Sequence, residues 1–181
     1  YYILNPFDIF KIWQGGMSFH GALIGIILGT YIFAIKKNIK ILILLDIIAC
    51  VSPIGLFFGR IANFINSELY GNPSNIYWSV IFPKIDNISR HPSQIYEAFL
   101  EGLLLFIILN FIIFKKEYQR GICSSLFLIL YGIFRIFSEQ FRAPDQQIGY
   151  LFNSISMGSL LSVLMIAGGI LILTNIRKNE I

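Results

Sequence analysis

The stretch ILILLDIIACVSPIGLFFGRIANF, residues 41–64, decides the fold class of this sequence. Its only charged residues are Asp46 and Arg60, and most of the others are large and apolar. A helix needs about 20 mainly apolar residues to cross the hydrocarbon core of a bilayer, and this stretch is long enough. The stretch therefore predicts a transmembrane helix.

The composition of the whole chain indicates the same class of protein. Of the 181 residues, 56% are hydrophobic and only 13% are charged, whereas a soluble domain needs more charge to cover its surface. The formal net charge is only +4, and no basic run with interleaved aromatic residues favours a nucleic-acid partner. Neither Cys50 nor Cys123 belongs to a metal-binding spacing, so we expect no metal and no disulfide.

Four further stretches are long and apolar enough to cross a membrane: residues 18–35, 95–114, 122–141 and 151–174. We therefore expect an all-α polytopic membrane protein, in which residues 1–181 form one integral membrane domain with five transmembrane helices. The stretch 66–94 separates the second and third expected helices. It contains Gly71, Pro73 and Trp78, which favour an ordered arm at the membrane surface over a flexible linker.

Basic residues in the connecting loops predict the orientation of these helices. They gather between the first and second spans, between the third and fourth, and after the fifth: Lys36, Lys37, Lys40, Lys115, Lys116, Arg120, Arg177 and Lys178. All these loops lie on one side, which the positive-inside rule makes cytoplasmic. The C-terminus is then cytoplasmic, whereas Tyr1 and the arm 66–94 lie on the outer face.

Polar residues of the second span collect at its outer end. Charged groups within a span cost free energy, so their presence indicates a function. Arg60, Asn63 and Asn66 are spaced by three residues and share one helix face. Glu68 and Gly71 follow as the chain leaves the membrane.

The fourth span carries charged residues at the same level. Arg135, Glu139 and Arg142 are spaced by four and three residues, so we expect them to share a face. His20 opens the first span and His91 precedes the third. An outward-facing polar chamber explains why these groups lie at one depth. The alternative is that the arginines snorkel separately to the headgroups, with Glu139 neutralising one of them.

Three other acidic residues lie within or beside the spans. Glu97 and Glu101, at the head of the third span, are further candidates to line the chamber. Asp46 lies in the inner half of the second span, and we expect it to serve helix pairing or folding rather than catalysis.

Four sequence blocks carry a family resemblance. The stretch GRIANFINSELYG, residues 59–71, resembles the G-R-x-[GA]-N-F-x-N-x-E-x-x-G signature of bacterial prolipoprotein diacylglyceryl transferases. GMSFHGAL at 16–23 resembles the family's GGMSFHGG block, with Ala22 where glycine is common. HPSQIYE at 91–97 resembles its HPSQ-x-YE block, and YGIFR at 131–135 begins its late arginine block.

The resemblance implies a fold with seven spans, an outside N-terminus and an inside C-terminus. Five spans fit that scheme with the first two missing, so we expect this chain to be a fragment. It also implies a reaction of the bacterial inner membrane, with the active site toward its outer face. The sn-1,2-diacylglyceryl group of phosphatidylglycerol moves to the lipobox cysteine of a prolipoprotein signal peptide, and glycerol 1-phosphate leaves. No cofactor is expected, because the membrane lipid is itself the activated donor.

This chemistry suggests roles for individual residues. The leaving phosphate needs fixed positive donors, and the arginine fork binds phosphate through two hydrogen bonds, so we expect Arg60 and Arg135 to bind it. His20 is the candidate base for the thiol, with a structural role as its alternative. Arg142 is a candidate gate. The expected substrate-binding residues are Arg60, Asn63, Asn66, Glu68, Gly71, Glu139 and Arg142.

Three rival functions remain open from the sequence. A secondary transporter would use Arg60 and Arg135 to bind an anionic solute, although no pair of broken helices repeats in two halves of the chain. In a non-catalytic membrane scaffold the arginines would pair only for folding. The third rival is a transferase that uses a different phospholipid, and its lipid specificity would distinguish it from a diacylglyceryl transferase.

Overall fold

The computed structural model describes residues 19–115, 118–143, 150–151 and 155–178. The chain divides into two compact units, Tyr1–Leu44 and Leu45–Ile181. The described part of the first unit is helix α1, Phe19–Lys37, and a turn at Asn38 that leads into helix α2, Ile41–Asn66. In this turn the Ile39 N–H donates to the Ala34 carbonyl over 2.9 Å.

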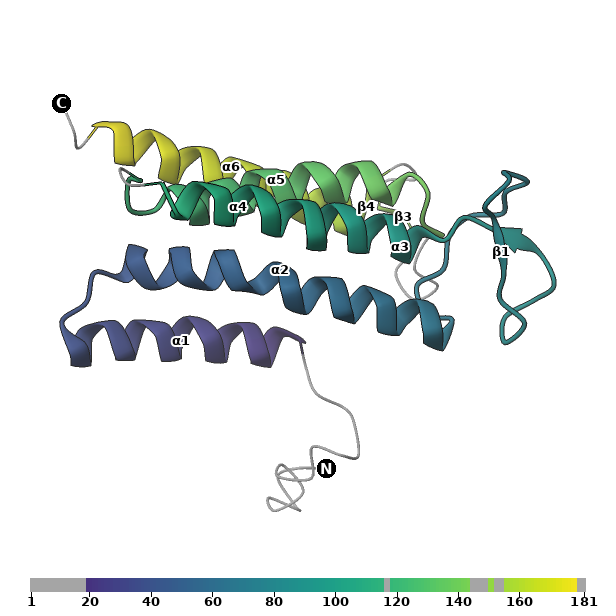
Figure 1. Ribbon diagram of the computed structural model, residues 1–181, viewed down its shortest axis with the longest axis horizontal. Coiled ribbons are helices and arrows are strands. Elements are labelled where there is room, and N and C mark those ends of the chain that lie inside the picture. The colour runs from purple at the N-terminus through teal and green to yellow at the C-terminus, as the bar shows by residue number, and fades with distance from the viewer. Residues whose placement is uncertain (1–18, 116–117, 144–149, 152–154, 179–181) are drawn as a thin grey trace, which may run out of the picture. The chain divides into compact units, whose positions relative to one another are not determined.

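The second unit consists mainly of long apolar helices. After α2 its helical segments are α3 (Ser93–Glu97), the π-helical η3 (Ala98–Leu104), α4 (Leu105–Ile113), α5 (Ile122–Glu139) and α6 (Met157–Lys178). The segments α3, η3 and α4 follow one another without a break and form one continuous helical rod (Figure 1). Two short antiparallel strand pairs complete the unit: β1 (Val80–Ile81) with β2 (Ser89–Arg90), and β3 (Tyr150–Leu151) with β4 (Ile155–Ser156).

Four helices of the described chain are long and apolar enough to cross a membrane. They are Ile41–Asn66, Ser93–Ile113, Ile122–Glu139 and Met157–Ile176. Large apolar side chains such as Ile107 and Phe111 point outward from them, with exposed fractions of 53% and 70%. A bilayer accepts such a surface, whereas water would not. The structure therefore confirms an all-α, multi-pass membrane architecture.

Two expected helix boundaries are wrong. Helix α5 ends at Glu139, so Arg142 does not share a helix face with Arg135. The chain leaves the helix there because residues 141–143 pair with residues 70–72, a contact that local spacing does not reveal. The last span was expected from residue 151, but α6 begins at Met157, after the β3–β4 pair.

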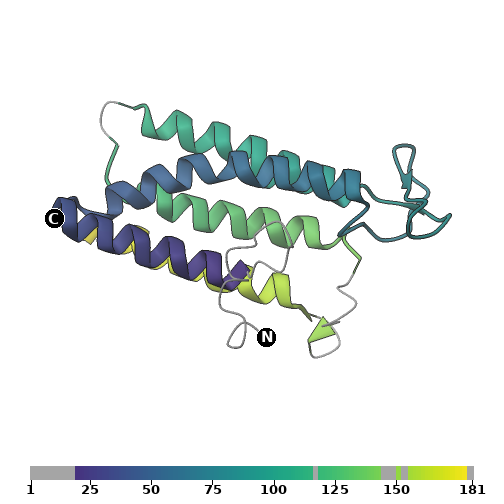
Figure 2. The same cartoon turned by 90° about the horizontal axis from the view of Figure 1, so that it is seen from below.

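Glycines allow close packing between α5 and α6, which run side by side (Figure 2). A Cβ atom on Gly132 of α5 would lie 2.8 Å from the Ser162 carbonyl oxygen of α6. A Cβ on Gly169 of α6 would lie 2.7 Å from the Ser125 carbonyl oxygen of α5. Membrane helices gain stability through such small-residue contacts, because lipid provides no hydrophobic drive to bring them together.

Asp46 joins α2 to the N-terminus of α5. Its fully buried carboxylate accepts the Gly121 N–H over 2.6 Å, the Ser124 N–H over 2.8 Å and the Ser124 hydroxyl over 2.9 Å. The first N–H groups of a helix lack partners within the helix, and a carboxylate satisfies them while it balances the helix dipole. These contacts support the helix-pairing role predicted for Asp46.

A small core lies where α2, α4 and α5 meet. It consists of Cys50, Leu105, Leu109 and Cys123, all almost completely buried. Both cysteines are free thiols, and each sulfur lies 3.8 Å from the Leu109 carbonyl oxygen. They therefore pack as small apolar residues.

The segment between α2 and α3 forms an arm that extends past the ends of these helices (Figure 1). Its tip carries the β1–β2 pair, in which Val80 lies opposite Arg90. The Trp78 indole N–H donates to the Tyr96 hydroxyl on α3 over 2.7 Å, which ties the arm to the helical rod. The expectation that residues 66–94 form an arm at the outer membrane surface stays a prediction.

Candidate functional site

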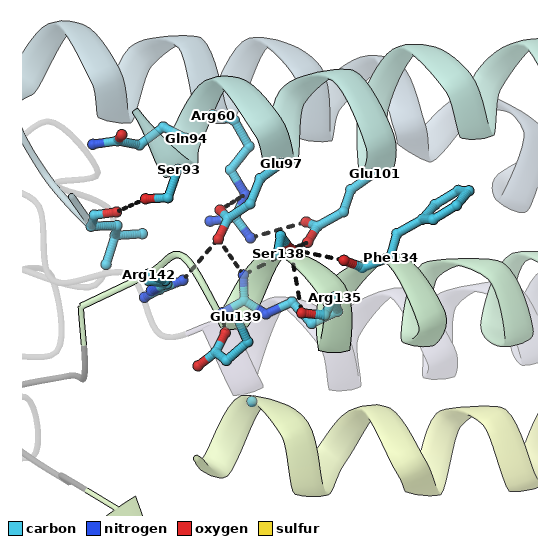
Figure 3. Close-up of polar contacts among 12 residues, drawn as sticks. Arg60, Ser93, Gln94, Glu97, Glu101, Phe134, Arg135, Ser138, Glu139 and Arg142 are labelled. Carbon is cyan, nitrogen blue, oxygen red and sulfur yellow. Dashed lines mark hydrogen bonds and ion pairs between the residues drawn. The ribbon is translucent and has the colours of Figure 1, made fainter. Parts of the chain in front are cut away.

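Glu97, the last residue of α3, lies at the centre of a buried charge cluster (Figure 3). Its side chain is fully buried. One carboxylate oxygen, Oε1, is 2.7 Å from Arg135 Nη1 and 3.6 Å from Arg142 Nη1. The other, Oε2, is 2.9 Å from Arg60 Nε. One carboxylate is therefore in ion-pair range of three arginines, which come from α2, α5 and the segment after α5.

Glu101 lies one helical turn further, within the π-helical segment η3. Its Oε2 atom is 3.2 Å from Arg60 Nη2, and its Oε1 atom is 3.7 Å from Arg135 Nη1. The Ser138 hydroxyl oxygen lies 3.3 Å from Oε1, and its nearest acceptor is the Phe134 carbonyl oxygen at 2.9 Å. A π-helical turn inside a longer helix is rare and occurs frequently at functional sites.

Glu139 completes the cluster at the end of α5. Its Oε2 atom is 2.7 Å from Arg135 Nη2, four residues earlier on the same helix. The carboxylate lies against the first turn of α6, because a Cβ atom built on Gly158 would be 3.1 Å from both of its oxygens. The positive end of a helix dipole favours an anion at this place.

The cluster is balanced in charge. Three arginines, Arg60, Arg135 and Arg142, face three glutamates, and all six side chains are largely or fully buried. Isolated charges in an apolar medium would be prohibitive, so each is held by an opposite charge. Within this arrangement every arginine keeps its direction, and the site is preorganised for an anion.

Arg142 has the weakest counter-charge of the three arginines. Its side chain forms one ion pair with a described residue, at 3.6 Å from Glu97. Burial lowers the pKa of Arg142, and the nearby charge of Arg135 lowers it further. An arginine remains protonated at neutral pH in any case, so Arg142 has hydrogen-bond donors that no described residue accepts and that suit an anion.

Backbone pairing positions Arg142 next to the arm. The Asn72 N–H donates to the Phe141 carbonyl over 2.9 Å, and the Ala143 N–H donates to the Tyr70 carbonyl over 3.1 Å. Gly71 lies between these bonds, and a Cβ atom there would be 2.7 Å from the Phe141 carbonyl oxygen. Only glycine fits this close approach. Its expected contact with substrate stays a prediction.

The structure brings together Arg60, Arg135, Glu139 and Arg142 among the expected site residues. It does not bring Asn66 and Glu68 into the charge cluster, because both side chains are exposed near the end of α2. Asn63 is half-buried one turn after Arg60. His20 lies in the first turn of α1, in the other unit, and its side chain falls outside the described part of the structure.

Sequence reasoning missed the central position of Glu97 and the part played by Ser138. Two glutamates spaced by four at the head of an apolar span were the available signal for Glu97 and Glu101. Nothing in the local sequence marks Ser138.

His91 has a structural environment. Its ring centroid lies 5.2 Å from the ring centroid of Phe141, and its Nδ1 atom is 3.3 Å from the Tyr96 hydroxyl.

Comparison with known proteins agrees with the four sequence blocks. The family model described as "Prolipoprotein diacylglyceryl transferase" matches residues 1–175. The chain belongs to this family. The resemblance drawn from the residues is therefore confirmed.

Three similar relatives carry the name phosphatidylglycerol–prolipoprotein diacylglyceryl transferase. The protein of Rickettsia bellii strain OSU 85-389 is 54% identical over 171 residues, which are 93% of this chain and 65% of the relative. That of Rickettsia typhi strain Wilmington is 52% identical over 170 residues, 93% of this chain and 66% of the relative. That of Ehrlichia canis strain Jake is 53% identical over 173 residues, which are 93% of this chain and 66% of the relative. The chain thus spans slightly less than two thirds of the length of these members of the diacylglyceryl transferase family.

Proposed function

We propose that the protein transfers the sn-1,2-diacylglyceryl group of phosphatidylglycerol to the lipobox cysteine of a prolipoprotein. The convergence of Arg60, Arg135 and Arg142 in one buried cluster carries this proposal, together with membership of the family. A snorkelling arginine would be solvated and unpaired at the interface. Arginines held by buried glutamates from other segments fit a site built for an anion.

The reaction forms a carbon–sulfur bond and breaks a carbon–oxygen bond. The cysteine thiol loses its proton, because the thiolate is the nucleophile. The sulfur attacks the glycerol carbon that bears the phosphate, a thioether forms, and glycerol 1-phosphate leaves with the bonding electron pair. Negative charge grows on the leaving phosphate, so preorganised guanidinium groups lower the barrier.

In this proposal Arg60 and Arg135 bind the phosphate and stabilise the leaving group. Arg142 lies closest to the arm and serves as the gate for the lipid. Glu139 orients Arg135, to which it is bound over 2.7 Å. Asn63, Asn66, Glu68 and Gly71 position the head group or the arm.

His20 is the proposed base for the thiol proton. An imidazole titrates near neutral pH, which suits proton transfer from a thiol. If His20 has this role, its replacement by alanine lowers the rate roughly 100- to 10,000-fold. A much smaller loss would assign His20 a structural role.

The proposed setting is the bacterial cytoplasmic membrane. Residues 1–181 form one integral membrane domain with five spans, the arm 66–94 on the outer face and a cytoplasmic C-terminus. The charge cluster then lies in the outer half of the bilayer. Phosphatidylglycerol enters from the lipid, and the signal peptide of the prolipoprotein docks beside the spans.

Release of glycerol 1-phosphate tests this function. The complete protein is reconstituted with phosphatidylglycerol and a lipobox peptide, and soluble glycerol 1-phosphate is measured over time. We expect release that requires both the lipid and the cysteine of the peptide, with no release by Arg60→Gln. A transporter or a scaffold would release none, and Arg120→Ala, which changes an exposed arginine before α5, controls for the loss of an arginine as such.

A further inference from the structure

We propose that Glu97 is the resident counter-anion of the phosphate site: it holds the three arginines together without lipid and gives up this place when a phosphate binds. The inference rests on the proposed function and adds a positioning residue to it. Glu97 itself does not react.

The position of Glu97 is the first argument. It is the one glutamate of the described cluster within 4.0 Å of all three arginines, at 2.7, 2.9 and 3.6 Å. Glu101 contacts Arg60 and Arg135, and Glu139 contacts only Arg135. The point where the three guanidinium groups converge is therefore occupied by the Glu97 carboxylate (Figure 3). A phosphate that uses the same three groups needs the same place.

The way in which Glu97 is held is the second argument. Glu101 has a polar neighbour besides arginine, the Ser138 hydroxyl at 3.3 Å. Glu139 lies against the first turn of α6, although its Oε2 atom, like that of Glu97, accepts no aligned hydrogen bond from a described residue. The ion-pair and hydrogen-bond partners of the Glu97 carboxylate among the described residues are all arginines. Its Oε2 atom is 2.9 Å from Arg60 Nε, yet no N–H of Arg60 points at it well enough to form a hydrogen bond. Its one aligned hydrogen bond comes from Arg135 Nη1.

Charge balance is the third argument. The cluster holds three positive and three negative groups, so a phosphodiester adds a negative charge that no arginine compensates. Like charges a few ångströms apart repel each other much more strongly in a poorly solvated site than in water. Withdrawal of the Glu97 carboxylate removes this repulsion and frees the guanidinium forks, which match phosphate oxygens.

Gln94 carries a further buried acceptor on the helix that bears Glu97. Gln94, one turn earlier on α3, is fully buried, and its amide N–H donates to the Glu68 carbonyl over 2.6 Å. Its Oε1 atom has no hydrogen-bond partner among the described residues. A buried acceptor without a donor costs free energy.

Affinity measurements with Glu97→Gln test the proposal. Dissociation constants of the complete protein are measured for a short-chain phosphatidylglycerol, for glycerol 1-phosphate and for a short-chain diacylglycerol. Removal of the competing charge is expected to lower the dissociation constants of both phosphate ligands at least about tenfold, while that of diacylglycerol stays unchanged. Turnover is expected to fall, because the arginines lose their common anchor. Tighter binding with slower turnover is a combination that a merely structural residue does not produce.

Glu101→Gln is the matched control, because it removes the same charge from a residue that does not contact Arg142. We expect a smaller gain in phosphate affinity from it. Unchanged or weaker phosphate binding in folded Glu97→Gln would overturn the proposal, as would equal gains from both variants. If Glu97→Gln does not fold, Glu97→Asp takes its place: its carboxylate is one methylene shorter, and an intermediate gain is expected, so unchanged affinity would contradict the proposal.

The two proposals fail in different ways. Absence of thioether product with the wild-type protein contradicts the transferase function, whatever the binding data show. An active wild type whose phosphate affinity does not respond to Glu97→Gln contradicts only the role of Glu97. Glu97→Gln could bind glycerol 1-phosphate more tightly without binding phosphatidylglycerol more tightly. The cluster would then bind the free product rather than the lipid, which also overturns the proposal.

Discussion

The carboxylate of Asp46 lies 2.8 Å from the backbone nitrogen of Ser124, so a residue of α2 caps the helix that carries Arg135. This contact and the pairing of Arg60 with Glu97 and Glu101 fasten α2 to the rest of the unit at two well-separated positions along its length. The cap at one end therefore helps to keep the arginines of α2 and α5 at the same level at the other.

Replacement of Asp46 by alanine is expected to destabilise the protein. Two backbone N–H groups and one hydroxyl lose a charged acceptor, which costs roughly 2–4 kcal/mol in a buried place. Thermal unfolding in detergent measures the loss. Ser124→Ala removes only the hydroxyl contact, and we expect it to cost less than half as much. Equal stability of wild type and Asp46→Ala would show that the cap is not needed.

Replacement of Arg60 by lysine is expected to lower the turnover number about 100-fold, in the range seen when one preorganised donor is lost. The guanidinium contacts Glu97 through Nε and Glu101 through Nη2, and a lysine ammonium lacks this planar fork. Steady-state kinetics with a lipobox peptide checks the loss, with Arg120→Lys as the control. Full activity in Arg60→Lys would mean that only a positive charge is required there.

Gly158 is expected to control the position of Glu139. A Cβ atom there would lie 3.1 Å from both carboxylate oxygens, so Gly158→Ala displaces Glu139 by a few tenths of an ångström. We expect a clear loss of turnover with a change in stability of no more than about 1–3 kcal/mol. Gly168→Ala is the matched control on the same helix, since nothing lies within 4 Å of its Cβ position. Equal effects of the two variants would contradict this role.

The order of the arm is expected to depend on pH. The Arg90 guanidinium beside Asp86 holds the pKa of that carboxyl below its ordinary value. Because the pKa is lowered, the ion pair stabilises the arm fully at pH values above the ordinary pKa of aspartate, about 4. This stabilisation is lost as the pH falls below that value and through the lowered pKa. Trp78 fluorescence follows the transition. Asp86→Asn should remove the acid step, and an identical titration of wild type and variant would assign it to other groups.

Local spacing predicted most of the helices and the gathering of arginines, because apolar spans and costly charges are both visible in the residues. It did not predict where Arg142 lies, since the chain turns away after Glu139 to pair with Gly71, far away in sequence. From spacing alone, Glu139 was an expected substrate-binding residue and Glu97 only a further candidate to line the chamber. Which carboxylate meets three arginines depends on how three segments pack together, and no spacing within one segment contains that information.

The central claim is tested most directly by the mass of the peptide product. The complete protein is reconstituted with phosphatidylglycerol of defined acyl chains and a lipobox peptide, beside an Arg135→Ala variant. The account predicts that the cysteine gains the mass of one diacylglyceryl group with the wild type, and that this adduct disappears in the folded variant. A folded, lipid-embedded wild-type protein that forms no adduct would contradict the account, and so would an Arg135→Ala variant that forms it at the wild-type rate.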